Sequence, residues 1–279
     1  TGSAGICIVG NDRAGVFVDG RYSIQAKKQT KSPFEVIQWN KKNFLQWIEK
    51  NITNGEIGFD PWLHSHKEIV ALSEAFADSD IGFAPSDNLI DKVWLNQPTK
   101  VSNQAMSYPV KLAGLTAKDK CQQIAVNIKF KKADAAVITL PDSIAWLLNL
   151  RGSDVIHNPI LHAFLIINRK GKIKLFCRNE NISSVIMGLE SFIKVFPIES
   201  FEMALTELNG TVLVDETTAP FAAVEILQRN GCKLVMGEDP IILPKACKNP
   251  IELKHAKICH KRDAVHMCEF LSWVDRQNE

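Results

Sequence analysis

Histidine and cysteine side chains gather near the C-terminal end of the chain, where they are the residues best suited to hold a metal ion. The group consists of His255, Cys259, His260, His266 and Cys268. Thiolate and imidazole groups on one helix face can bind zinc. His255 and Cys259 are four residues apart and would share such a face, but Cys268 lies well beyond them. We therefore predict a structural helix at this place and no metal site.

Carboxylates are the other groups that could do chemistry, because two-metal hydrolysis needs several of them around ions about 3.5–4 Å apart. The best placed aspartates instead follow strands or sit in turns, where Asp is favoured because its side chain bonds its own backbone. They are Asp12, Asp19, Asp60 and Asp215. We predict turn roles for all four, and neither a catalytic residue nor a metal ligand in this chain. No nucleophile motif of the GxSxG kind occurs either.

The charge balance argues against nucleic acid as a partner. Lys and Arg number 33 against 31 Asp and Glu, a net charge of +2, whereas nucleic-acid-binding domains carry a basic stripe. No apolar run approaches the roughly 20 residues of a membrane-spanning helix, so we expect no membrane partner. Seven cysteines without a CxxC pair are typical of reduced thiols in a cytoplasmic protein. The first residue is Thr1 rather than Met, so a targeting signal is not readable.

Apolar runs alternate with helical patterns along the whole chain, which predicts an α/β fold. In the first third we expect a β-hairpin over 6–18, followed by a helix from Arg21. A strand over 56–60 leads into a helix that starts at Pro61, because proline suits the first turn of a helix. A further short helix is predicted over 89–94. The turn-rich stretch that follows is the predicted domain boundary.

The helix expected after this boundary has a clear start. Thr116 with Asp119 three residues later predicts a capping box. The helical spacing of Cys121, Ile124 and Ile128 places all three on one apolar stripe. We therefore predict that this helix packs on the core of a second domain.

Strands and helices alternate again through the rest of the chain. The run 135–140 is rich in small and β-branched residues and predicts a buried strand, and Pro141 opens another helix. A second hairpin is expected over 164–176, and a strand over 211–214. A long helix is predicted over 250–273.

Three segments carry a family resemblance. The first consists of GSAG at 2–5 and DGRY at 19–22. The second is IAWLLNLRGSDV at 144–155, which continues to HNP at 157–159. The third is KNPIE at 248–252, which opens the last helix. In this order they resemble the N-terminal, non-catalytic domains of Xaa-Pro aminopeptidases (aminopeptidase P) in the creatinase/prolidase family. The resemblance extends over essentially the whole chain.

The resemblance implies two similar domains, each a mixed β-sheet flanked by helices, in residues 1–105 and 106–245. Residues 246–279 would carry the first helix of a pita-bread catalytic domain that is missing here, and a further strand and helix would precede residue 1. In the family that catalytic domain holds two divalent metal ions, for which manganese is expected. The full-length protein is expected to be a homodimer.

The resemblance also implies an activity. The full-length protein would act on proline-containing peptides and release the N-terminal residue that precedes proline. The present domains would shape and restrict the substrate cleft, and this chain alone would be inactive. The alternative is a catalytically dead family member that serves as a protein- or peptide-binding module.

Two groups of residues are candidates for functional contacts. In the family the arginine of DGRY approaches the substrate cleft, so the resemblance assigns substrate binding to Arg21. The alternative is that Arg21 pairs with Asp19 or caps the hairpin. Arg151, Asp154 and His157 form a polar turn in apolar surroundings. They are expected to hold the second domain against the catalytic one, unless an internal salt bridge explains them.

Overall fold

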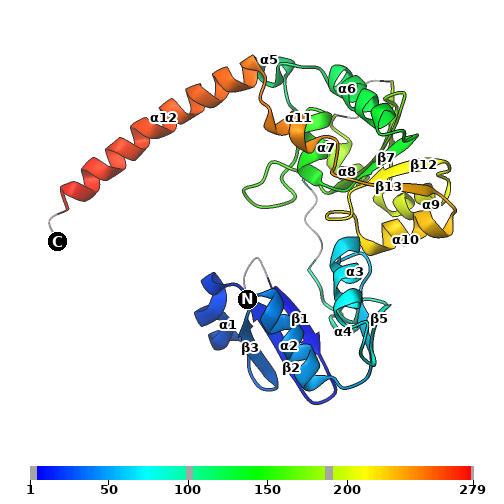
Figure 1. The fold of residues 1–279 in the computed structure, drawn as a ribbon. Helices are drawn as coiled ribbons and strands as arrows, with labels where there is room; N and C mark the ends of the chain where they lie inside the picture. Colours follow the sequence, from blue (N-terminus) through cyan, green and yellow to red (C-terminus); the bar gives the residue numbers. More distant parts are fainter. Residues whose placement is uncertain (1–4, 99–102, 186–190, 278–279) are drawn as a thin grey trace. The chain divides into compact units, whose positions relative to one another are not determined.

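The computed structural model describes residues 5–98, 103–185 and 191–277 (Figure 1). The chain divides into two compact units, one made of residues 1–61 and 68–90, the other of residues 62–67 and 91–279. Both units mix helices and strands, so the predicted α/β class is confirmed. The first three residues of the GSAG motif lie outside the described residues.

The first unit opens with the predicted hairpin, which is confirmed. Strand β1 (Gly5–Val9) pairs antiparallel with β2 (Ala14–Val18). Strand β3 (Phe34–Gln38) then pairs parallel with β2, and β4 (Gly55–Phe59) pairs parallel with β5 (Ile81–Pro85) in a separate two-stranded sheet.

The helices of this part of the chain follow the strands in sequence. The predicted helix near Arg21 is present as a short 3-10 turn (Gly20–Tyr22) and α1 (Ser23–Gln29). The predicted helix α4 (Leu89–Val93) is also present. Two further helices are α2 (Lys41–Asn51) and α3 (His66–Ala75). Asn40 begins α2, because its side-chain oxygen accepts from the Asn43 N–H at 2.8 Å.

Aromatic side chains form the core of the first unit. Phe17 of β2 is fully buried and meets two rings of α2 edge to face, with centroid distances of 4.9 Å to Phe44 and 5.9 Å to Trp47. Ile48 of α2 is also fully buried. Helix α2 therefore holds its place through burial of one apolar face.

The predicted helix start at Pro61 is wrong. Residues 61–65 form turns and an isolated bridge from Ser65 to Pro220, and α3 begins only at His66. Residues 62–67 belong to the second unit. There the His66 N–H donates to the Ala219 carbonyl, and the Phe221 N–H donates to the His64 carbonyl. These bonds satisfy backbone groups of the turn before α3 and override the local preference of proline for a helix start.

The second unit is built on a six-stranded mixed sheet with the order β11-β10-β9-β7-β12-β13. Strands β9 and β10 form the predicted second hairpin, which is confirmed. Strand β7 is parallel to β12 and antiparallel to β9. The bounds are β7 (Ala135–Ile138), β9 (Ala163–Asn168), β10 (Ile173–Cys177), β11 (Ile193–Phe196), β12 (Thr211–Val214) and β13 (Lys233–Met236). A separate two-stranded sheet joins β6 (Met106–Ser107) and β8 (Leu150–Arg151).

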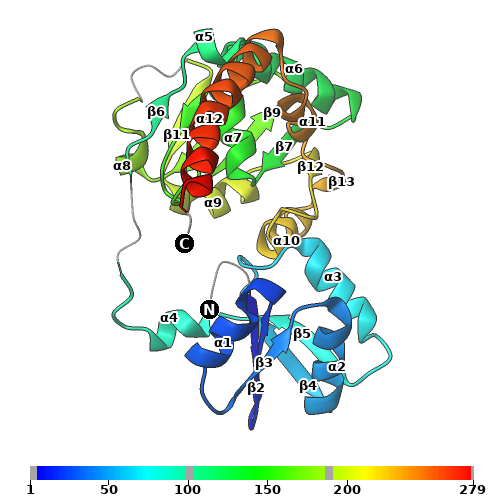
Figure 2. The ribbon, with the colours of Figure 1, turned by 90° about the vertical axis from the view of Figure 1, so that its left-hand side faces the viewer.

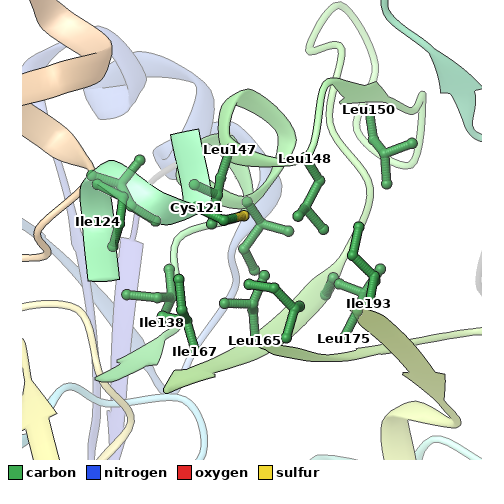
Figure 3. Packing of buried hydrophobic residues seen from close by; sticks show 14 of the residues in the cluster. Cys121, Ile124, Ile138, Leu147, Leu148, Leu150, Leu165, Ile167, Leu175 and Ile193 are labelled. Carbon is green, nitrogen blue, oxygen red and sulfur yellow. The ribbon is translucent and has the colours of Figure 1, made fainter. Parts of the chain in front are cut away.

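Helices cover both faces of this sheet. Figure 3 shows one face, where Ile138 and Leu165 pack with Ile124 of α6 (Ala117–Phe130) and Leu147 of α7 (Pro141–Leu147). On the other face, α9 (Phe201–Thr206) and α10 (Phe221–Arg229) pack in a second cluster with alternate residues of the same strands. Because side chains of a strand alternate between faces, each central strand contributes to both clusters.

The remaining helices are short, with one exception. Helices α5 (Val110–Ala113), α8 (Asn179–Ile182) and α11 (Ile242–Ala246) each span one turn or little more. The exception is the predicted last helix, which is present as α12 (Pro250–Asp275; Figure 2). The predicted capping box of α6 is also confirmed: Asp119 N–H donates to Thr116 Oγ1 at 3.1 Å, and the Asp119 carboxylate accepts from the Thr116 N–H.

All seven cysteines are free thiols. Cys121, Cys177 and Cys232 are buried, and the other four are exposed. Within the described residues, none of the helices combines the length and apolarity needed to cross a membrane.

Candidate functional site

A buried lysine lies at the centre of the main polar network of the second unit. Lys120 precedes Ile124 and Ile128 by four and eight residues, so all three share the inner face of α6. Its side chain is only 1% exposed. The ammonium Nζ donates to the Trp146 carbonyl at 2.9 Å and to Asn149 Oδ1 at 2.8 Å. It also lies 4.0 Å from the centroid of the Trp146 ring, within the range of a cation–π interaction.

Burial lowers the pKa of Lys120 to about 8, because the charged ammonium loses its water shell. Two neighbouring charges act in opposite directions. The Glu252 carboxylate favours the protonated form, and the Arg151 guanidinium disfavours it. The two hydrogen bonds that the ammonium donates are therefore needed to keep this cation inside the protein.

Trp146 connects the lysine to the start of α12. The indole Nε1 donates to Glu252 Oε1 at 3.0 Å. The other carboxylate oxygen of Glu252 accepts from the Asn249 N–H at 2.9 Å, and Asn249 Oδ1 accepts from the Glu252 N–H at 3.0 Å. This reciprocal pair is the capping box of α12. A hydrogen bond between residues far apart in the sequence thus fixes the first turn of the longest helix.

Asn149 extends the network in the opposite direction. Its backbone is left-handed, with φ 51°. Its Nδ2 donates to the Leu115 carbonyl at 2.8 Å, and its own carbonyl accepts from the Tyr108 N–H at 2.7 Å. The side chain therefore bridges Lys120 and the loop before α6.

Arg151 holds the turn that follows α7. Its Nη1 donates to the carbonyls of Ala145 at 3.0 Å and Leu150 at 2.7 Å. The guanidinium carbon lies 4.1 Å from the Tyr108 ring centroid. Burial lowers the pKa of Arg151. The interdomain contact predicted for this arginine stays a prediction, and its geometry already shows a local structural role.

Asp154 and His157 lie in the next turn. Asp154 Oδ2 accepts from the His162 N–H at 2.8 Å, and Oδ1 accepts from the Asn103 N–H at 3.3 Å. His157 is exposed and left-handed, with φ 65°. Arg151 and Asp154 use different partners, and the predicted interdomain roles of Asp154 and His157 remain untested.

Arg21 lies in the first unit and pairs with Asp19. The distance from Nη2 to Asp19 Oδ2 is 2.6 Å, and the Arg21 side chain is 71% exposed. Asp19 Oδ1 also accepts from the Arg21 N–H at 2.9 Å. The pairing weighed as the alternative is therefore present, while substrate binding by Arg21 stays a prediction.

Buried carboxylates also follow two neighbouring parallel strands, β12 and β13. Asp215 Oδ1 accepts from Thr217 Oγ1 at 2.6 Å and Oδ2 accepts from the Asp239 N–H at 2.9 Å. Burial raises the pKa of Asp239. The turn roles predicted for Asp215 and for Asp19 are confirmed, since both bond nearby backbone.

The described residues do not fit a pair of divalent metal ions. Across 5–98, 103–185 and 191–277, no three His, Cys, Asp or Glu side chains are arranged to hold an ion. On α12, His266 Nδ1 instead lies 3.2 Å from Glu269 Oε2. The Lys120 network instead has a structural role: through Trp146 and Glu252 it holds the start of α12 against the rest of the second unit.

Lys120 was not identified from the sequence, although one signal was present. A lysine four residues before Ile124 on the buried stripe of a predicted helix must be buried or must bend its side chain out to water. Trp146, Asn149 and Glu252 were noted only as parts of motifs, and nothing in their spacing indicates a contact.

The hydrogen bond between Trp146 and Glu252 should be measurable. We expect Trp146→Phe to lower the free energy of unfolding by about 1–3 kcal/mol, because it removes the donor to a carboxylate. Urea unfolding of Trp146→Phe, Glu252→Gln and the double variant gives the coupling energy. Fully additive effects would show that this bond does not contribute.

Comparison with known proteins shows which family this chain resembles. Two family models described as creatinase/prolidase N-terminal domain match the chain, one over residues 1–93 and one over residues 96–252. A probable Xaa-Pro aminopeptidase P of Arthroderma gypseum is 30% identical over 292 residues, which cover 99% of this chain and 46% of that protein. The Xaa-Pro aminopeptidase ApepP of Drosophila melanogaster is 28% identical, with 99% and 47% covered.

A solved structure matches over nearly the same span. It is the X-prolyl aminopeptidase from Caenorhabditis elegans, described as a cytosolic enzyme with a di-nuclear active site. The TM-score is 0.84 at 25% sequence identity, and the match covers 98% of this chain and 46% of that one. The chain thus spans about half the length of the relatives it matches.

Proposed function

Because this chain belongs to the creatinase/prolidase N-terminal domain family, we propose that it is the non-catalytic front part of a metal-dependent Xaa-Pro aminopeptidase. The observation that carries this proposal is the pattern of coverage. Two N-terminal-domain models account for residues 1–93 and 96–252, while the chain spans 44–49% of curated aminopeptidases of this kind.

In the full-length protein these units would shape and restrict the substrate cleft. A bond that precedes proline lacks an N–H and carries a ring, so a dedicated cleft has to accommodate it. Arg21 is the residue we propose for contact with the peptide, because its guanidinium is exposed and can bind a carboxylate. The Lys120 network would fix the start of α12 and, through it, the domain that follows.

The metal ions, the cellular location and the oligomeric state are proposed for the full-length protein. It would hold two divalent metal ions, with manganese as the proposed metal, act in the cytoplasm and form a homodimer. The two ions are supported by the di-nuclear active site and the cytoplasm by the cytosolic location, both described for the Caenorhabditis elegans relative.

The proposal is tested by assaying the purified chain with an Xaa-Pro-Pro peptide and added Mn²⁺. We expect no release of free amino acid and no stoichiometric metal by elemental analysis, with the Drosophila melanogaster relative as the active control. Turnover that a chelator abolishes would overturn the proposal. Fusion of the chain to the catalytic half of that relative, followed by the same assay, then tests whether these units can serve a peptidase.

A further inference from the structure

Two apolar side chains are exposed near the end of α6, which lies on the outside of the second unit (Figure 2). Val126 is 65% exposed and Phe130 is 86% exposed. They are four residues apart and are therefore neighbours on the outer face of the helix. Lys129, three residues after Val126, is also exposed and borders this pair. The last turn of α6 thus presents an apolar ridge beside a cation.

The turn between β9 and β10 packs against the same helix. A Cβ atom at Gly171 would lie 3.6 Å from the Cys121 carbonyl oxygen and 3.9 Å from the Ala125 Cβ atom. Lys170 and Lys172, on either side of this glycine, are exposed. Because Ala125 is one helical turn before the end of α6, the turn adds two cations next to the apolar ridge.

The connection from α6 to β7 completes this surface. Lys132 is exposed, and it lies two residues before Asp134, whose carbonyl accepts from the Arg169 N–H at 2.9 Å. The Arg169 guanidinium pairs with the Asp134 carboxylate, with 3.0 Å between Nη1 and Oδ1. We call the exposed side chains at this place the basic corner: Val126, Lys129, Phe130, Lys132, Lys170 and Lys172.

The basic corner carries four cations without counter-ions. Among the side chains that the structure describes, none forms an ion pair with these lysines. Helix α6, its connection to β7 and the β9–β10 hairpin contain two carboxylates. Asp119 is engaged in the capping box of α6, and Asp134 is engaged with Arg169. Since the whole chain has a net charge of only +2, four unpaired cations at one place are a local excess.

We propose that the basic corner docks on an anionic membrane surface, with its lysines at the lipid phosphates and carboxylates and with Val126 and Phe130 inserted among the headgroups. Clusters of lysine bind anionic leaflets, and an apolar face next to them adds buried area. The binding would be reversible and sensitive to salt, because few side chains carry it. This proposal does not depend on peptidase activity.

The shape of the basic corner favours a membrane over a peptide partner. It consists of the end of a helix and the tip of a hairpin, which are convex elements. A peptide is usually held in a groove or along a free sheet edge, whereas a bilayer needs neither. The expectation of no membrane partner rested on the lack of a spanning helix, and a protein that binds from one side of the membrane does not need one.

The test measures co-sedimentation of the purified chain with phosphatidylcholine vesicles that contain either no phosphatidylserine or about 30% of it. At an ionic strength of about 0.05 M, where screening is weak, we expect at least about tenfold tighter binding to the vesicles with phosphatidylserine. Raising the ionic strength to about 0.5 M should remove most of this binding.

A pair of double variants tests the lysines. Lys170→Glu combined with Lys172→Glu should weaken binding to the anionic vesicles by at least about tenfold, since each lysine at such a surface contributes about fivefold. Lys41→Glu combined with Lys42→Glu is the matched control. Both lysines are exposed in the first turn of α2 in the first unit, where Glu is well tolerated, and binding should change by less than about twofold.

The apolar ridge is tested separately. Phe130→Ser should weaken binding by about fivefold, whereas Phe130→Leu, which keeps an apolar side chain, should not. Circular dichroism of each variant checks that the fold is retained, as expected for a side chain that is 86% exposed.

Four outcomes would overturn the proposal. The first is equal affinity for vesicles with and without phosphatidylserine, and the second is an equal loss in the two double variants. The third is unchanged binding after Phe130→Ser. The fourth is binding to polyglutamate, lost in the variant of Lys170 and Lys172, without binding to vesicles, which would identify an acidic polypeptide as the partner.

Discussion

Lys120→Ala is expected to lower the free energy of unfolding by about 3–5 kcal/mol. The substitution removes a buried four-carbon stem, and truncation of a long apolar chain in a core costs about 2–5 kcal/mol. It also leaves the Trp146 carbonyl and Asn149 Oδ1 without their donor, and a buried unpaired acceptor costs about 1–3 kcal/mol. Urea unfolding followed by circular dichroism measures the loss.

A matched control lies two residues away on the same helix. Lys118 is exposed, so Lys118→Ala should change the free energy of unfolding by less than about 0.5 kcal/mol. Lys120→Met keeps most of the stem and should cost less than Lys120→Ala. Equal losses for Lys118→Ala and Lys120→Ala would contradict the role assigned to Lys120.

The pH dependence provides a second readout for the same residue. The folded-state pKa of Lys120 is about 8, below its ordinary value of 10.5, so between these values the unfolded chain binds more protons at this group. Stability then rises with pH across this range. The buried thiols act in the opposite direction, since burial raises the pKa of Cys177 to about 12. The contribution of Lys120 is therefore obtained from the difference between the wild type and Lys120→Met, which should grow from pH 8 to pH 10.5.

Gly152→Ala should be the second severe substitution, with an expected loss of about 3 kcal/mol in the free energy of unfolding. A Cβ atom at this position would lie 2.6 Å from the Ile160 carbonyl oxygen and 2.9 Å from the Leu161 nitrogen. Both contacts are with backbone, so no side-chain rotation relieves them. The segment that ends at Leu161 would have to move, and the hydrogen bond from the Asp154 N–H to the Ile160 carbonyl would be strained.

Gly237→Ala is the control for this substitution in the same unit. There a Cβ would meet only the flexible end of Lys131 at 3.2 Å and a Leu213 methyl at 3.5 Å. We expect a change within about 0.5 kcal/mol. Thermal unfolding of the two variants compares them directly, and equal midpoints would refute the steric argument.

Sequence patterns predicted those elements whose signals are local. The β-branched run of β7, the Thr116 capping box and both hairpins are examples, because propensity, turn residues and burial agree there. The family resemblance drawn from the three motifs is also confirmed, since the two family models match the chain.

The missed elements carry weaker local signals. Strand β3 is only half-buried, with Glu35 and Gln38 exposed, so its extended form depends on pairing with β2. The helix start predicted at Pro61 was wrong for the opposite reason. There a strong local preference was overridden by hydrogen bonds to residues more than a hundred positions away.

The Lys120 network could not be predicted from the sequence either, because it depends on contacts between distant residues. Trp146 and Glu252 are 106 residues apart, and the burial of Lys120 depends on where the turn after α7 places a carbonyl and an amide. The residues that motifs did single out, Arg151 and Asp154, turned out to bond neighbouring backbone. Their predicted contact with a further domain remains to be tested.

The buried thiols give the second unit a chemical reporter of its opening. Cys121, Cys177 and Cys232 are buried and all lie in the second unit, so an alkylating reagent reaches them only when that unit opens. Cys7 is exposed on β1 in the first unit. Mass spectrometry of alkylated peptides therefore follows the opening of the second unit, and Cys7, which reacts in the folded state, serves as the internal standard for the reagent.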